Sequence, residues 1–159
     1  MNEKAMKIKQ PKRRGEWVEL RFMAADENDL NVTRPWGDSA QYDFILEHEG
    51  RFLRIQVKST QFFDRGCDPC AVKGSHWPYA DNAFDFLVVY VLPEDVWYII
   101  PKRVLRGQAS VALRPACETS KYAKYLGAWE LLKKEMECAL EDSADQPNQC
   151  KNIDSGISK

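Results

Sequence analysis

The stretch Tyr42–Thr60, with the sequence YDFILEHEGRFLRIQVKST, decides the predicted fold. Residues 42–47 are rich in aromatic and branched side chains, and residues 51–59 alternate polar and apolar ones. Both patterns are typical of β-strands, and the sequence His-Glu-Gly at 48–50 is typical of a tight turn. The stretch is therefore predicted to form a β-hairpin, and the remaining elements are expected to be arranged around it.

Polar side chains of this hairpin are predicted to converge on one spot. Side chains two residues apart share a face of a strand, so Gln56 and Lys58 lie on one face together with Arg54. Asp43 opens the first strand and is expected across the hairpin from Gln56 and Lys58. Polar groups that face a core cost free energy unless they are paired or bind something, so this spot is a candidate functional site. The opposite face carries the apolar side chains of Leu53, Ile55 and Val57.

Length and composition indicate an ordinary soluble domain. The chain has 159 residues, of which 44% are hydrophobic and 30% charged, and this is enough to bury a core within one domain. It has no apolar run of the roughly 20 residues that cross a bilayer, so no membrane partner is expected. Residues 1–16 lack the apolar stretch of a signal peptide, and a cytoplasmic location is therefore expected.

Charge is unevenly distributed, although the formal net charge is only −1. Residues 1–134 carry a net charge of +3, and residues 135–159 carry −4. We expect a basic N-terminal arm over residues 1–11, a domain over 12–140 and an acidic tail over 141–159 that is too polar to order itself. The basic residues near the start form either a solvated segment or a contact with phosphates, which includes Lys12, Arg13 and Arg14.

The first half of the chain is predicted to contain a helix, a short strand, the hairpin and a long loop. The helix is expected over residues 12–28, where apolar side chains recur at spacings of three and four, and the strand over 30–35. Residues 62–82 are expected to be irregular, because they mix glycines and prolines with polar residues. This loop either contacts nucleic acid through basic side chains such as Arg65 and Lys73 or is a plain surface excursion. The apolar side chains of the helix are Trp17, Leu20, Met23 and Ala24.

The second half is predicted to add strands and a final helix. Residues 83–92 form a near-continuous apolar run, as in a strand covered on both faces, and residues 96–100 form the next strand. A helical turn is expected over residues 101–105 and a small edge strand over 109–113. Ser120 is the predicted N-cap of a helix that runs to about residue 140. The fold class is therefore α/β in the broad sense, an α+β mixed sheet flanked by helices. The predicted buried stripe of the last helix is Tyr125, Ala128, Trp129, Leu132 and Met136.

The cysteines admit a metal-binding interpretation and a simpler one. The chain has five of them, an odd number that fits reduced thiols. Cys67 and Cys70 have the spacing of a zinc knuckle, with His76 nearby. A structural zinc site needs four ligands, so Cys117 would have to be recruited from a distant part of the chain. Free thiols in a polar loop are the simpler interpretation.

The order of these motifs resembles the PD-(D/E)XK nuclease superfamily, and more closely the bacterial group that includes homing endonucleases of group I introns. The first helix carries Gly-x-x-x-Glu at 15–19, a Pro-x-Gly-Asp turn at 35–38 leads to Tyr42-Asp43, and Ile-Gln-Val-Lys occupies 55–58. Two later strands also match, Asp-Phe-Leu-Val-Val-Tyr at 85–90 and Trp-Tyr-Ile-Ile-Pro at 97–101. The likeness covers residues 12–140 and implies a restriction-endonuclease-like core. Gln56 stands where the superfamily has an acid, a change that the closer group tolerates.

This resemblance implies a divalent-metal site. The metal would polarise the phosphate and lower the pKa of water. Asp43 is the implied central ligand, and the Gln56 side-chain oxygen and the Val57 backbone carbonyl complete an oxygen-only shell suited to Mg²⁺, with Mn²⁺ as a substitute. With Gln56 neutral, we expect weaker metal binding than in an all-acid site.

Two further side chains receive roles from the resemblance. Lys58 would position or deprotonate the attacking water, or offset developing charge. Glu19 would contact water carried by the metal, or a second metal, with Glu16 as the alternative because the two acids share one helix face. Taken alone, both acids are ordinary solvent-exposed helix residues. A structural ion pair between Asp43 and Lys58 is the competing interpretation of the hairpin.

The implied function is a Mg²⁺-dependent DNA endonuclease of homing or restriction type that leaves 5′-phosphate and 3′-hydroxyl ends. Cutting double-stranded DNA needs two active sites, so a homodimer or homotetramer is expected. One alternative is a catalytically weak or inactive DNA-binding protein with the same fold, which would bind DNA without turnover. Another is a junction or repair nuclease that recognises DNA structure, which would prefer branched to linear DNA.

Overall fold

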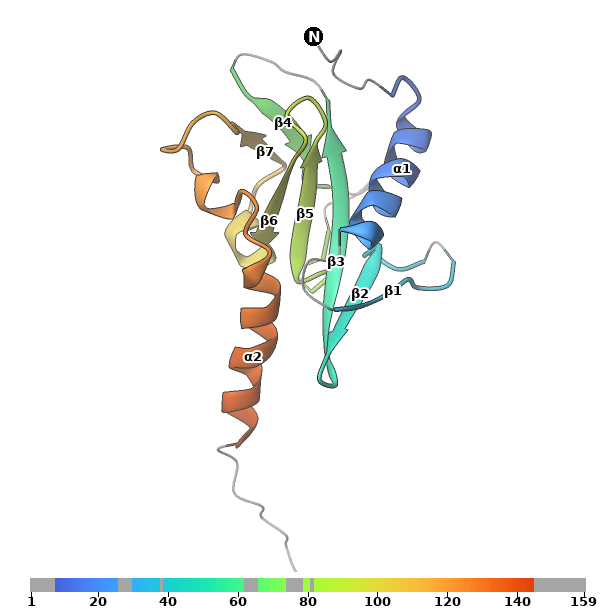
Figure 1. Ribbon diagram of the computed structural model, residues 1–159, viewed down its shortest axis with the longest axis vertical. Helices are drawn as coiled ribbons and strands as arrows, with labels where there is room; N and C mark the ends of the chain where they lie inside the picture. Colours follow the sequence, from blue (N-terminus) through green and yellow to red (C-terminus); the bar gives the residue numbers. More distant parts are fainter. Residues whose placement is uncertain are drawn as a thin grey trace, which may run out of the picture.

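The computed structural model describes residues 8–25, 30–37, 39–61, 66–73, 79–80 and 82–144 (Figure 1). Two helices, α1 (Pro11–Ala24) and α2 (Glu130–Ala144), stand at the two ends of this part of the chain. Two short 3-10 helices, η1 (Lys102–Leu105) and η2 (Ala123–Tyr125), precede α2. The strands are β1 (Asn31–Thr33), β2 (Phe44–His48), β3 (Arg51–Thr60), β4 (Asp68–Ala71), β5 (Phe86–Val91), β6 (Val96–Pro101) and β7 (Ser110–Leu113).

The strands of the described residues form a five-stranded sheet in the order β1-β2-β3-β5-β6 and a separate pair, β4-β7. Strand β3 is central, because it pairs antiparallel with β2 on one side and parallel with β5 on the other. The remaining pairs are antiparallel. The predicted mixed sheet with flanking helices is therefore confirmed (Figure 1).

The predicted hairpin is present, with its turn at the expected position. His48 pairs with Arg51, so the turn has two central residues, Glu49 with φ 50° and Gly50 with φ 76°. Positive φ at both positions is the signature of a type I′ turn, whose twist matches that of the flanking strands. The Glu47 carboxylate stabilises the turn by accepting the Gly50 N–H at 3.0 Å.

The two partners of β3 lie on its opposite edges and cover different halves of its length. On one edge Arg51–Ile55 pairs with β2, and on the other edge Ile55–Thr60 pairs with β5. Beyond Ile55, the edge of β3 that faced β2 therefore has no strand beside it. Buried backbone N–H and C=O groups on that edge must find other partners.

Each face of the sheet has its own buried cluster. On one face, Val18 of α1 and Leu132 of α2 pack against sheet residues such as Ile55. The other face is covered by the β4-β7 pair and the segment around η2, which bury side chains such as Leu113 and Tyr125. All six residues of β5 are buried, which confirms the strand that was expected to be covered on both faces.

Helix α1 buries a face that only partly matches the one that its apolar spacing marks. Trp17 packs half-buried against the core as expected, and Val18 and Phe22 are buried, whereas Leu20 is 66% exposed and Met23 44% exposed. The Phe22 ring packs against an aromatic group of three side chains, with ring centres 5.1–6.2 Å away: Phe44, Trp97 and Trp129.

The ends of α1 also differ from prediction. The helix begins at Pro11, where a missing N–H costs nothing, and ends at Ala24 instead of residue 28. The predicted basic arm lies mostly outside the described residues, which begin at Ile8. Ile8 itself is held to Gln61 by two amide hydrogen bonds, of 3.2 and 3.1 Å.

The predicted 62–82 loop was wrong in part, because it contains β4. Asp68 of β4 pairs with Leu113, and Ala71 with Ser110, so the predicted edge strand near 109–113 exists but lies in the second sheet. Pro69 argued against a strand, yet a two-stranded pair tolerates proline because its outer edge needs no N–H donor.

The final helix begins about ten residues later than predicted. Ser120 does not cap it, and its hydroxyl has no hydrogen-bond partner among the described residues. The chain instead runs along β6: Leu126 forms a β-bridge with Tyr98, and Gly127, at φ 62°, donates its N–H to the Trp97 carbonyl at 2.8 Å. These long-range contacts outweigh local helix propensity. Within α2, Leu132 and Met136 are buried as expected.

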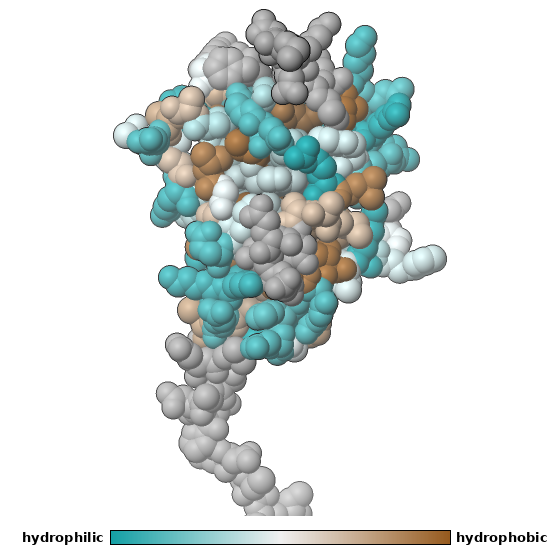
Figure 2. All heavy atoms as spheres, in the orientation of Figure 1, coloured by the Kyte–Doolittle hydropathy of each residue, from teal (hydrophilic) through white to brown (hydrophobic). Residues whose placement is uncertain are grey.

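The surface in view is largely hydrophilic, with small separate hydrophobic areas (Figure 2). In the described part of the chain, neither helix has the length and apolar character needed to cross a membrane.

The burial of α1 generates a stability prediction. Phe22→Ala should lower the free energy of unfolding by about 3–5 kcal/mol, because it leaves a cavity among aromatic rings. Leu20→Ala, on the same helix but exposed, should change it by less than about 0.5 kcal/mol. Urea unfolding followed by circular dichroism measures both. Equal effects would contradict the orientation of α1.

Candidate active site

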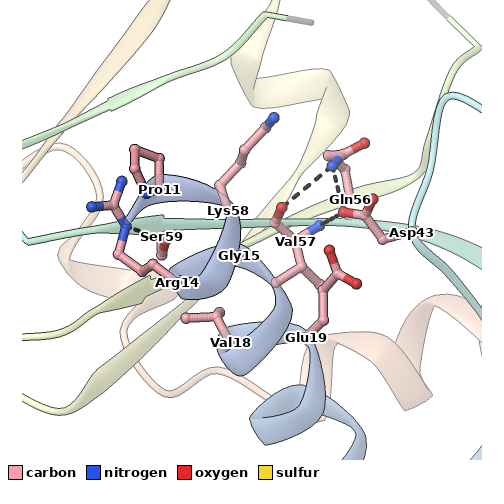
Figure 3. A pocket seen from close by; sticks show the side chains of 10 residues that line it. All are labelled: Pro11, Arg14, Gly15, Val18, Glu19, Asp43, Gln56, Val57, Lys58 and Ser59. Atoms are coloured by element: carbon pink, nitrogen blue, oxygen red, sulfur yellow. Dashed lines mark hydrogen bonds between the residues drawn. The ribbon is translucent and has the colours of Figure 1, made fainter. Parts of the chain in front are cut away.

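A cavity of about 270 Å³ lies between α1 and the unpaired edge of β3. Figure 3 shows that side chains from α1, β3 and the residue before β2 meet there. It therefore brings together the predicted residues from three separate parts of the chain. Its lining consists of Pro11, Arg14, Gly15, Val18, Glu19, Asp43, Gln56, Val57, Lys58 and Ser59.

Asp43 takes the place of a missing strand partner. Its backbone N–H donates to the Ile55 carbonyl at 2.8 Å, directly beside the last β2–β3 pair, Phe44 with Ile55. Its carboxylate Oδ2 accepts the Val57 N–H at 2.7 Å and a hydrogen bond from the Gln56 amide. The carboxylate is thereby fixed at the edge of the cavity.

Asp85 shows what the same arrangement looks like when it is purely structural. It precedes β5 as Asp43 precedes β2, and its Oδ2 accepts the Arg54 N–H at 2.7 Å. The Arg54 guanidinium, however, also pairs with Asp85 at 2.9 Å, so this carboxylate is neutralised. Asp43 is in none of the ion pairs of the described residues. Of the two, Asp43 retains the ability to attract a cation.

Gln56 lies opposite Asp43 as predicted, but its amide is turned the other way. The side chain is 6% exposed, and Nε2, not the oxygen, faces the Asp43 carboxylate and the Val57 carbonyl, the latter at 3.3 Å. Both partners are acceptors, so an N–H donor is the group that satisfies them. The oxygen would reach them only after half a turn of the amide.

The structure brings Glu19, and not Glu16, into the cavity. Glu16 is exposed on the outer side of α1. The Glu19 and Asp43 carboxylates lie on the same side of the cavity (Figure 3).

Sequence reasoning missed Arg34, which contacts this group. Its Nη2 lies 3.0 Å from Glu19 Oε2. The available signal was its place directly before the Pro-x-Gly-Asp turn, on the chain that leads to Asp43.

Burial raises the pKa of both carboxyl groups. For Asp43, desolvation is the largest cause, and the Val57 N–H and the charges of Lys58 and Arg34 oppose it. For Glu19, desolvation is again the largest, followed by the charge of Asp43, with Arg34 the main opposing group. A buried acid whose ionisation is further disfavoured by a neighbouring carboxylate forms a spot where a cation is stabilised.

Lys58 lines the cavity with its stem, but its ammonium points away from Asp43 (Figure 3). Its Nζ lies 5.7 Å from the centre of the Tyr79 ring. The alternative Asp43–Lys58 ion pair is therefore absent from the described residues. A weak cation–π contact with Tyr79 therefore holds the ammonium near the cavity, and Lys58 can give up this contact for another partner.

The candidate DNA-binding residues have different surroundings. Lys12 and Arg13 are exposed in the first turn of α1, and Lys73 is exposed after β4. Arg14 lines the cavity and donates from Nε to Ser59 Oγ at 3.3 Å. Arg65 lies outside the described residues.

In the described part of the chain, the cysteines do not form a metal site. No group of three or more His, Cys, Asp or Glu side chains suited to a metal occurs there, and His76 lies outside it. Cys67, Cys70 and Cys117 form no disulfide among the described residues. Burial raises the pKa of Cys70 to about 12, so it packs as a neutral side chain.

The donor atoms of the cavity suit a hard divalent cation. Glu19 Oε2 is buried and accepts no hydrogen bond among the described residues, because its ion pair with Arg34 at 3.0 Å is not aligned as one. It can therefore accept a ligand if Arg34 moves away. Asp43 and the Val57 carbonyl contribute further oxygens at the same edge. An all-oxygen set with two carboxylates is of the kind that Mg²⁺ and Mn²⁺ prefer.

Comparisons with known proteins agree with this geometry. A family model described as PD-(D/E)XK endonuclease matches residues 9–132. Among solved structures, a bacterial homing endonuclease, I-Ssp6803I, is 25% identical with a TM-score of 0.69, over 80% of this chain and 95% of that chain. The crystal structure of MepB is 15% identical with a TM-score of 0.38, over 70% and 94% of the two chains, which is too low to support an argument.

Among curated proteins, none matches the sequence. The family match nevertheless covers most of the chain and includes every residue that lines the cavity. The chain therefore belongs to the PD-(D/E)XK endonuclease family.

Proposed function

We propose that this chain is a divalent-metal-dependent endonuclease that cuts double-stranded DNA, with Mg²⁺ as its ion and Mn²⁺ as a substitute. The observation that carries the proposal is the Asp43 carboxylate, fixed by the Val57 N–H at 2.7 Å beside Glu19 and left without an ion-pair partner of its own. Two carboxylates held side by side can bind the cation that a phosphodiester hydrolase of this endonuclease family needs.

Each residue of the cavity has a definite task in this proposal. Asp43, Glu19 and the Val57 carbonyl would hold the cation, which supplies Lewis-acid stabilisation of the phosphate and an acidified water when bound. Lys58 exchanges its contact with the Tyr79 ring, worth about 0.5–1 kcal/mol, for a phosphate oxygen or the attacking water. There its ammonium offsets developing negative charge or holds the water in line.

The helix wall of the cavity is open to a DNA backbone. Gly15 faces the cavity, and a Cβ built on it meets no atom within 4 Å. A glycine inside a helix costs about 1 kcal/mol relative to alanine, and here it leaves space beside the carboxylates. Arg14 stands at the same wall, and Lys12 and Arg13 are exposed directly before it at the start of α1, so phosphates that approach this end of the helix meet positive charge.

The type of endonuclease is proposed from likeness. The similarity to a bacterial homing endonuclease supports a homing- or restriction-type activity on duplex DNA. Since a single chain forms the cavity described above and a duplex has two strands to cut, a double-strand cut calls for a homodimer or homotetramer. A cytoplasmic location belongs to the same proposal.

One observation favours a second candidate, a DNA-binding protein with little or no turnover. The Gln56 amide occupies two of the oxygens that a cation would use, Asp43 Oδ2 and the Val57 carbonyl. If the amide does not turn, the cation site stays closed. DNA binding without cleavage in Mg²⁺ or Mn²⁺ would identify this case.

Nicking of supercoiled plasmid DNA in Mg²⁺, Mn²⁺, Ca²⁺ or EDTA tests the proposal. Wild type should cut in Mg²⁺ and Mn²⁺, and Asp43→Ala and Lys58→Ala should each lower the rate by about 10²-fold or more. Glu19→Gln should also lose activity, whereas Glu16→Gln, its exposed neighbour on α1, should retain it.

Activity that survives Asp43→Ala and Lys58→Ala together would place the chemistry elsewhere. If wild type is inactive on plasmid, a randomised-target library repeats the test for a long recognition site. Circular dichroism spectra of all variants show that lost activity is not lost folding.

Gln56→Glu tests the cost and benefit of a third acid. The change removes the N–H donors to Asp43 and adds a buried charge, so the cation-free protein should lose about 1–3 kcal/mol of stability. Mn²⁺ should bind about tenfold more tightly, because the site gains a negative ligand. Urea unfolding in EDTA and calorimetric titration with Mn²⁺ measure the two effects.

The exposed Gln41 supplies a control for this substitution. Its side-chain oxygen accepts the Ala80 N–H at 3.4 Å, and a carboxylate retains that bond. Gln41→Glu should therefore change neither quantity by much. Unaltered Mn²⁺ affinity in Gln56→Glu would argue against a cation at this position.

The raised pKa values predict how cation binding depends on pH. A cation needs both carboxylates ionised, and their pKa values lie above the ordinary 4.5 of glutamic acid and 3.8 of aspartic acid. Mn²⁺ affinity should therefore fall as the pH is lowered, with a midpoint above 4.5. Calorimetric titrations between pH 8 and pH 4.5 measure this, and constant affinity down to pH 4.5 would contradict it.

A further inference from the structure

Arg34 reaches into the candidate site from solvent. Its side chain is 61% exposed, whereas that of Glu19, its partner at 3.0 Å, is 21% exposed. The charge of Arg34 also lowers the pKa of both Glu19 and Asp43. One exposed cation therefore acts on both of the carboxylates to which the proposed function assigns a divalent ion.

The contact between Arg34 and Glu19 is an ion pair without an aligned hydrogen bond. Although Nη2 lies 3.0 Å from Glu19 Oε2, this oxygen is buried with no hydrogen-bond partner among the described residues. Charge-assisted pairs are strongest when their N–H groups point at the oxygens. This pair lacks that geometry, so it is open to exchange.

Only the arginine side chain has to move in such an exchange. Arg34 follows directly after β1, whose last residue, Thr33, pairs with Ile45 of β2. The backbone next to Arg34 is therefore held by the sheet. From this anchor the guanidinium presents donors of a geometry that matches phosphate oxygens.

A divalent cation and Arg34 compete for the same charge. A guanidinium beside Glu19 repels an incoming cation and occupies one of its ligands, so the cation binds more weakly while Arg34 stays. A DNA phosphate would draw Arg34 away and remove this repulsion. Binding of DNA and binding of the cation would then strengthen each other.

We propose that Arg34 neutralises Glu19 in the absence of DNA and transfers to a DNA phosphate when DNA binds, which frees Glu19 for the divalent cation. This inference rests on the proposed function, because it takes DNA and a cation as the ligands. It adds a residue that links the two binding events.

Arg34→Gln separates the two roles because they predict opposite changes. Without DNA, calorimetric titration at pH 8 should show Mn²⁺ bound roughly tenfold more tightly than by wild type, since a repelling charge is gone. In EDTA, fluorescence anisotropy with a short random-sequence duplex should show weaker binding. The slope of log affinity against log salt should be smaller by about 0.9, the value for one lost phosphate contact.

A third readout measures the link directly. Ca²⁺ should strengthen duplex binding by a larger factor in wild type than in Arg34→Gln, because only wild type gains from the release of Glu19. Arg103→Gln is the matched control: Arg103 is 60% exposed and pairs with Glu135 at 3.0 Å, away from the cavity lining. It should leave Mn²⁺ affinity and the effect of Ca²⁺ unchanged.

The outcomes are distinguishable. Unchanged or weaker Mn²⁺ binding by Arg34→Gln would overturn the competition, and an unchanged salt slope would overturn the phosphate contact. An equal effect of Ca²⁺ in both proteins would overturn the link. If wild type itself binds neither Mn²⁺ nor duplex DNA, the proposed function fails, whereas normal binding by wild type and Arg34→Gln alike refutes only the role of Arg34.

Discussion

The hydrogen bond from the Val57 N–H to the Asp43 carboxylate, at 2.7 Å, is the interaction on which the site depends. Strand β2 ends opposite Ile55, whereas β3 continues to Thr60 with β5 on its other edge. The N–H and C=O of Val57 therefore lie on an edge with no neighbouring strand. Such groups are costly when buried without partners. The sheet meets that requirement with a carboxylate in place of a strand, so the same side chain completes the fold and attracts cations.

Asp43 and Asp85 show how neighbouring charges distinguish a carboxylate that can still attract a cation from one that is already neutralised. Each precedes a strand and each accepts a backbone N–H of β3. Arg54 neutralises Asp85 with a direct ion pair, and no such partner is fixed to Asp43. The excess negative charge therefore gathers at Asp43 and Glu19, where burial raises both pKa values. Burial of this excess charge disfavours the folded state, and the ion pair of Arg34 with Glu19 offsets part of it.

The parts of the fold that follow from local pattern were predictable, and those set by distant contacts were not. The hairpin and β5 carry strong strand signals and a turn with Gly50, so their positions follow from neighbouring residues. Strand β4 exists because β7, some 40 residues later, pairs with it. In the site, the motif placed Asp43, Gln56 and Glu19 at one spot. The direction of the Gln56 amide, the contact of Lys58 with Tyr79 and the presence of Arg34 depend on packing between separate segments, which no spacing encodes.

The glutamine at position 56 becomes intelligible from the same electrostatics. An acid there would place a third carboxylate beside Asp43 and Glu19, in surroundings where burial and the charge of Asp43 already raise the pKa of Glu19. An amide instead donates N–H groups to Asp43 and the Val57 carbonyl, and so stabilises the folded chain without a cation. Arg34 contributes to the same end by its ion pair with Glu19. Both groups are exchangeable, one by rotation of an amide and the other by movement of an exposed side chain. The site is therefore balanced within the folded protein by groups that a cation and a phosphate can replace.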